Sequence, residues 1–78
     1  MTHIETHEWL DYLHGSKVID RFQWIDLRTM LDHRLTSVSV KATAFANRMQ
    51  DTHPELWVSF QTKRRILGLS SSNPTHNQ

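Results

Sequence analysis

The chain has no cysteine and very little glycine or proline. Its 78 residues include two glycines and two prolines. The lack of cysteine excludes a disulfide framework and a thiolate zinc site, so the reducing cytoplasm is the expected location. With so few glycines, the phosphate-binding loops and nucleophile elbows of many enzymes are scarcely available. We therefore predict no catalytic residues and a protein that is not an enzyme.

Long apolar runs and a secretory leader are also missing. No run approaches the roughly 18–20 apolar residues that a membrane span needs. Residues 1–5 read MTHIE, without a cationic or an apolar leader region. We expect no membrane partner.

The length allows one domain at most. Residues 70–78 contain no apolar side chain and are predicted to form a disordered tail. Residues 1–69 are predicted to form a single helical domain with a small core. A partner, or a second copy of the chain in a homodimer, could supply part of its stability.

Charge is divided unevenly along the chain, although the net charge is only +1. Residues 1–33 carry six carboxylates against three cationic side chains. Residues 34–78 carry six cationic side chains against two carboxylates. This division indicates that the C-terminal half meets a polar partner.

Apolar spacing predicts an all-α fold, a compact bundle of four or five short helices. The first helix is expected over residues 3–14, where apolar side chains recur on one face. Thr2 is available as its N-cap, and Gly15 has the position of the glycine that follows a last helical turn.

The next segment carries two apolar stripes that lie on different faces. One straight helix cannot bury both, so the pattern predicts two short helices over 17–24 and 27–35 with a bend between them. Asp26 would cap the second of these helices.

A further helix is predicted over 40–51, with Ser39 as its cap. Its expected inward stripe is narrow. The residues of this stripe are Ala42, Phe45, Ala46 and Met49.

The strongest local signal is a capping box formed by Thr52 and Glu55, with Pro54 near the first turn. The helix that it opens would run to about Leu67 and end at Gly68.

Alternation of apolar and polar side chains over 56–62 also fits a strand, with residues 66–67 returning as its partner. We prefer the helix, because the turn of such a hairpin would fall on Lys63, Arg64 and Arg65, where there is no glycine, asparagine or aspartate.

The outer face of the 40–51 helix has the chemistry of a DNA-reading surface. Short side chains let a helix approach the major groove, an asparagine can read an adenine edge, and cations can hold phosphates or guanine. With the preceding helix and a short link, the layout is like a helix-turn-helix. An ordinary solvated surface helix is the alternative. The predicted nucleic-acid-binding residues are Lys41, Thr43, Ala44, Asn47, Arg48, Lys63, Arg64 and Arg65.

Six histidines are many for this length. His3, His7 and His14 fall on one side of the first helix, and zinc commonly takes histidines four residues apart on a helix. His3 and His14, however, are about 16 Å apart along the axis, and no other segment signals a further ligand. The histidines are therefore predicted to form a solvated stripe, with no metal and no other cofactor.

Aromatic residues offer a different type of surface. Tryptophan and tyrosine are enriched at interface hot spots, although they also fill small cores. The residues concerned are Trp9, Tyr12, Trp24 and Trp57. The leading hypothesis is a small non-enzymatic regulator that binds nucleic acid. The alternative is an adaptor or inhibitor that binds another protein through its helical surface.

Overall fold

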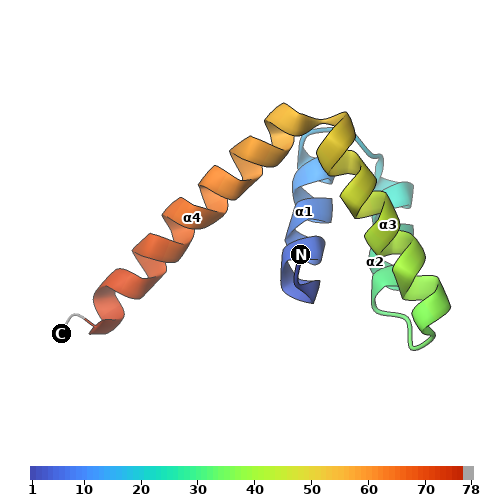
Figure 1. The fold of residues 1–78 in the computed structure, drawn as a ribbon, viewed down its shortest axis with the longest axis horizontal. Coiled ribbons are helices and arrows are strands. Elements are labelled where there is room, and N and C mark those ends of the chain that lie inside the picture. The colour runs from blue at the N-terminus through green and yellow to red at the C-terminus, as the bar shows by residue number, and fades with distance from the viewer. Residues whose placement is uncertain (77–78) are drawn as a thin grey trace.

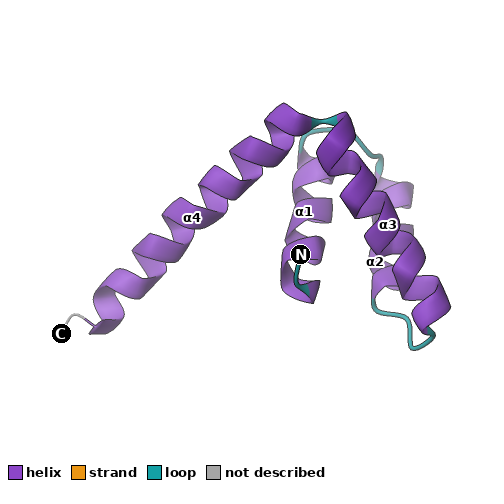
Figure 2. Ribbon diagram, viewed as in Figure 1, coloured by secondary structure: helices purple, strands orange, loops and turns teal. Residues whose placement is uncertain are grey.

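The computed structural model describes the backbone of residues 1–76 and the side chains of residues 1–68. Four helices make up the described chain, and it contains no strand (Figures 1 and 2). They are α1 (His3–Gly15), α2 (Arg21–Leu31), α3 (Thr36–Thr52) and α4 (Pro54–His76). The all-α prediction is confirmed, and residues 56–62 are helical rather than extended.

The first three helices pack together, and α4 diverges from them. In Figure 1 the chain runs up α1, down α2 and back up α3, and α4 then leaves from the same end as a long arm. At 1.5 Å per residue, α4 is about 34 Å long, which accounts for much of the 44 Å longest dimension of the molecule. Because α2 and α3 run side by side in opposite directions, they form a hairpin of helices, whereas a helix-turn-helix crosses its helices at about 90–120°.

Helix α1 begins as the sequence predicts and ends differently. Thr2 Oγ1 accepts the backbone N–H of Glu5 at 3.1 Å, and the Glu5 carboxylate accepts the N–H of Thr2 at 2.9 Å, which completes a capping box. Gly15 is the last residue of α1 and Ser16 is its C-cap, so the predicted role of Gly15 as the glycine that follows the helix is wrong. The left-handed residue that follows the helix is Lys17, with φ of 63°. It lies in a Schellman motif, in which the Val18 N–H donates to the Leu13 carbonyl at 2.9 Å.

Helix α2 is one helix rather than two with a bend. Its cap is Asp20, which accepts the backbone N–H of Gln23 at 2.7 Å, and Asp26 lies inside the helix. One of the two apolar stripes, which contains Phe22 and Ile25, does not face the core, because these side chains are 83% and 46% exposed, so no bend is needed to bury it. Residues 16–20 form the connection from α1.

Helix α3 begins at Thr36, with Leu35 at the N-cap, so the predicted cap Ser39 lies within the first turn. The predicted capping box at Thr52 is not formed. Thr52 is the last residue of α3, and its hydroxyl donates back to the Arg48 carbonyl at 3.0 Å. Pro54 is the first residue of α4, as expected, because that position needs no backbone N–H.

The core forms where α1 packs on the other helices. Trp9, Leu10 and Leu13 are fully buried. The Trp9 indole N–H donates to the Ala46 carbonyl of α3 at 2.9 Å, and its ring lies 5.3 Å from that of Phe60 in α4. The predicted inward stripe of α3 is confirmed, with its two alanines buried and Phe45 and Met49 packed against the core.

Helix α4 continues past Gly68, where the sequence predicted its end. Of the predicted disordered tail, residues 70–78, the structure describes only the backbone of residues 70–76, which continues α4. The side chains of the tail and the whole of residues 77–78 lie outside the described part of the chain. The order of the tail and the domain boundary at 69 therefore stay predictions. Within residues 1–76, no helix combines the length and the apolar character that crossing a bilayer requires.

Candidate functional site

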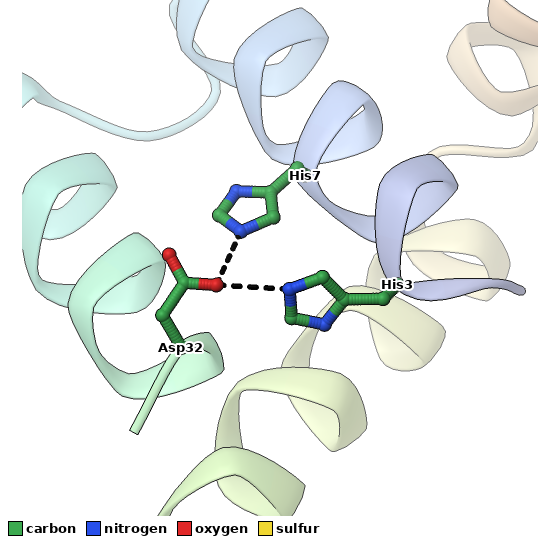
Figure 3. Close-up of side chains that lie close together, drawn as sticks. All are labelled: His3, His7 and Asp32. Atoms are coloured by element: carbon green, nitrogen blue, oxygen red, sulfur yellow. Dashed lines mark hydrogen bonds and ion pairs between the residues drawn. The ribbon is translucent and has the colours of Figure 1, made fainter. Parts of the chain in front are cut away.

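Two histidines and an aspartate converge where α1 meets the end of α2 (Figure 3). His3 Nε2 lies 2.9 Å and His7 Nε2 lies 2.7 Å from the same oxygen, Asp32 Oδ1. Because an ionised carboxylate only accepts, both ring nitrogens donate to it. The three ligand atoms lie within 4.8 Å of one another.

The backbone explains this convergence. His3 and His7 are four residues apart on α1, so they occupy one face in successive turns. Asp32 is the C-cap of α2, where the chain turns toward α3. The hydrogen bond from His7, together with that from His3, lowers the pKa of Asp32 below its usual value, against the opposing effect of burial.

The side chains of the cluster differ in freedom. The side chains of His3 and Asp32 are 58% and 57% exposed, whereas that of His7 is 19% exposed. The second ring nitrogen of His7, Nδ1, is buried and has no hydrogen-bond partner among the residues that the structure describes. One member of the cluster is therefore fixed by its surroundings, and the other two can adjust.

His14 does not belong to this cluster, although the sequence grouped it with His3 and His7. Its ring stacks on Trp24 at a centroid distance of 4.3 Å. Asp11, on the same side of α1, accepts the Trp24 indole N–H at 2.8 Å. Sequence reasoning missed Asp32 because only the packing of α1 on α2 brings it to His3.

Among the three adjacent basic residues of α4, Lys63, Arg64 and Arg65, the charge of Arg64 is neutralised by ion pairs. Arg64 Nε donates to Glu8 at 2.6 Å and its Nη1 donates to Glu5 at 3.0 Å, so this arginine joins α4 to α1. The backbone N–H of Thr2 and the Arg64 charge lower the pKa of Glu5, while burial opposes them. Two carboxylates of α1, Glu5 and Glu8, are thus paired with Arg64.

The predicted contact residues of α3 lie mainly in solvent. Lys41, Ala44, Asn47 and Arg48 are exposed, whereas Thr43 is half-buried and its hydroxyl donates to the Ser39 carbonyl. The Arg48 guanidinium lies 5.8 Å from the centre of the Phe45 ring. Within the described residues, none of these side chains forms an ion pair.

The basic residues of the predicted nucleic-acid surface lie on two different helices, with Lys41 and Arg48 on α3 and the others on α4. Lys63 and Arg65 are exposed on α4, which diverges from α3 after Pro54 (Figure 1). The structure therefore does not bring them into one continuous surface with Lys41 near the start of α3.

A groove separates α1 from α4. Its apolar lining comes from Tyr12, Phe60 and Leu67, and Lys63 stands beside them with its ammonium 5.8 Å from the centre of the Tyr12 ring. Phe60 is 3% exposed, whereas Leu67 is 55% exposed. The deep end of the groove belongs to the core, and its outer end is open to solvent.

No known protein family matches the sequence, and no curated protein or solved structure matches the chain.

Proposed function

We propose that the protein is a small non-enzymatic regulator that acts by binding another protein through α4 and the groove beside it. The observation that carries the proposal is the exposed apolar surface of an arm that leaves the helical body. Val58, Ile66 and Leu67 of α4 are 59%, 57% and 55% exposed. In proteins most of the stability of a helix comes from the packing of its apolar face rather than from the helix itself.

The chemistry of the surface favours an acidic amphipathic helix as the partner. Lys63 and Arg65 are exposed beside the apolar residues and form no ion pair within the described part of the chain. The nearby acids of α1 are occupied, because Glu5 and Glu8 pair with Arg64. A partner with an apolar stripe and flanking carboxylates would complement both features.

The half-buried aromatic Tyr12 gives the groove an anchor point. Tyrosine and tryptophan are the residues whose truncation most often costs an interface about 2 kcal/mol or more. Leu67 lies on the opposite wall of the same groove. An apolar side chain inserted between them would cover the outer end of the groove.

The test is capture of a partner by the immobilised full chain, followed by identification and a titration of affinity. Leu67→Glu places a charge in the groove and should weaken binding by about 2 kcal/mol, roughly thirtyfold. Gln61→Glu is the matched control, because it adds the same charge to an exposed position of α4 outside the groove. Equal effects of the two variants would refute the groove as the binding site.

Nucleic-acid binding through α3 is the second candidate. Lys41, Asn47 and Arg48 favour it, because they are exposed and form no ion pair with any side chain that the structure describes. Capture that is abolished by nuclease and falls steeply with salt would indicate this function, since counterion release makes such binding strongly salt-dependent. Lys41→Glu with Arg48→Glu should then abolish binding, whereas Leu67→Glu should not.

A further inference from the structure

We propose that His3, His7 and Asp32 form a binding site for a zinc-class divalent metal ion that joins α1 to the end of α2. This inference is independent of the proposed function. The three side chains bring two imidazole nitrogens and one carboxylate oxygen together, with both nitrogens directed at Asp32 Oδ1 (Figure 3). Three protein ligands of these types, with a water in the fourth position, are a common zinc environment.

To accept the ion, the exposed side chains must rearrange so that the two ring nitrogens, which lie within 4.8 Å of each other, approach to about 3.3 Å. Zinc binds histidine nitrogen and carboxylate oxygen at about 2.0–2.2 Å, so neighbouring ligand atoms of a tetrahedral site lie about 3.3 Å apart. The nitrogen-to-oxygen distances of 2.9 and 2.7 Å must therefore widen by about half an ångström. His3 and Asp32 are exposed and can make this change while His7 stays in place.

The arrangement of the two rings supports the same conclusion. The rings of His3 and His7 meet edge to face, with centroids 4.9 Å apart and an interplanar angle of 77°. Each ring nevertheless directs its Nε2 at Asp32 Oδ1. Both Nε2 atoms therefore already lie at the carboxylate, and when the ion binds there each Nε2 proton leaves, either to solvent from a protonated ring or to Nδ1 of the same ring from a neutral one.

The ligand set also selects the type of ion. Imidazole suits zinc and neighbouring transition metals, whereas calcium and magnesium prefer sites built from oxygen alone. With one carboxylate and two neutral rings, the site should therefore prefer Zn²⁺ or Co²⁺ to Mg²⁺ or Ca²⁺.

The surroundings of His7 predict that the ion is exchangeable. A metal-bound histidine usually donates its other ring N–H to an acceptor, and loss of such a partner costs about 10–100-fold in affinity. Within the described part of the chain His7 Nδ1 is buried without such a partner, whereas His3 and Asp32 are open to solvent. The site is therefore suited to reversible occupation rather than to a permanent structural ion.

The experiment is a titration of the untagged full chain with Zn²⁺ by calorimetry and with Co²⁺ by visible absorption. Co²⁺ is preferred to Cu²⁺ and Ni²⁺ as the optical probe, because those ions take square-planar nitrogen ligands that backbone amides near His3 could supply. We expect one ion per chain, no displacement by excess Mg²⁺, and shifts of the His3 and His7 ring resonances but not of the His14 resonance.

Variants distinguish this site from other histidines. His7→Ala and Asp32→Asn should each weaken binding by at least roughly tenfold, as removal of a ligand costs no less than removal of its outer partner. His14→Ala removes a histidine from the same helix outside the cluster and should leave the affinity unchanged. Circular dichroism of each variant checks that the fold is retained.

Any one of three results would overturn the proposal. These are the absence of a stoichiometric ion, an equal loss of affinity in His14→Ala, and retention of full affinity in a folded Asp32→Asn.

Discussion

The three-helix body and the α4 arm differ in how their apolar residues are used. Eight of the nine buried apolar residues of the described chain lie in α1–α3 and their connections, and one, Phe60, lies in α4. The arm keeps Val58, Ile66 and Leu67 in solvent, and the body also exposes large apolar side chains, of which Phe22 is 83% accessible. Most of the core lies in the body, whereas α4 is held through Trp57, Phe60 and the ion pairs of Arg64, and its described residues Val58, Ile66 and Leu67 stay accessible to a partner.

Trp9→Ala should break this arrangement most strongly, because Trp9 connects the body to the arm. Its ring packs on Trp57 and Phe60 of α4, and its N–H binds the Ala46 carbonyl of α3. We expect the free energy of unfolding to fall by about 3–5 kcal/mol, a large part of the 5–15 kcal/mol typical of a domain. Urea denaturation followed by circular dichroism measures the loss.

Two further variants set the scale for Trp9→Ala. Trp9→Phe keeps an aromatic ring and loses the hydrogen bond, so its cost should be clearly smaller. Ile66→Ala, on the exposed arm, should change stability by no more than about 0.5 kcal/mol. A comparable loss in Ile66→Ala and Trp9→Ala would mean that the arm is packed as tightly as the body.

Ala46→Leu tests the close approach of α3 to the rest of the body. Ala46 is fully buried, so the larger side chain should cost about 1–3 kcal/mol through overpacking. Ala44→Leu makes the same change two residues away on the exposed side of α3 and should cost almost nothing. Similar melting temperatures for the two variants would contradict the assigned inward face.

The sequence predicted the helices better than their ends. The period of apolar residues is a property of each segment, so the helices around Leu10, Ala46 and Phe60 could be expected from the pattern alone. Where a helix begins depends on which of several neighbouring residues forms its cap, and spacing alone does not decide this. Thr2 and Thr52 both stand three residues before a glutamate, yet only Thr2 forms the capping box, because α3 extends through Thr52 and uses its hydroxyl internally.

The candidate metal site was predictable only in part. His3 and His7 share a helix face, so their pairing follows from spacing alone. Asp32 lies 25 residues beyond His7 and reaches it only because α2 packs against α1. For the predicted nucleic-acid surface, spacing on one helix was likewise easier to predict than long-range packing. Lys41 and Arg48 lie on the expected outer face of α3, whereas Arg64 of α4 pairs with Glu5 and Glu8 of α1.

Thr2→Ala and Thr52→Ala compare the two threonine signals directly. Thr2→Ala removes the capping oxygen of α1 and should cost about 0.5–2 kcal/mol. Thr52→Ala removes only a hydroxyl that bonds within its own helix, so a change below about 0.5 kcal/mol is expected. Thermal denaturation measures the two effects. A larger effect for Thr52→Ala than for Thr2→Ala would indicate that Thr52 forms the capping box predicted for α4.

Gly15→Ala and Gly68→Ala provide the smallest and most selective test of body against arm. Both glycines are helical, neither has positive φ, and a Cβ at either position would meet no atom within 4 Å. Alanine should therefore favour the helix at each site by about 0.5–1 kcal/mol.

In Gly15→Ala this gain should raise the stability of the whole body, because α1 carries the core residues Leu10 and Leu13. In Gly68→Ala it should stabilise only the arm locally, seen as slower amide exchange around residue 68 with little change in the melting temperature. A loss of stability in Gly15→Ala would place that glycine in the left-handed conformation, and a raised melting temperature in Gly68→Ala would show that the outer part of α4 unfolds together with the body.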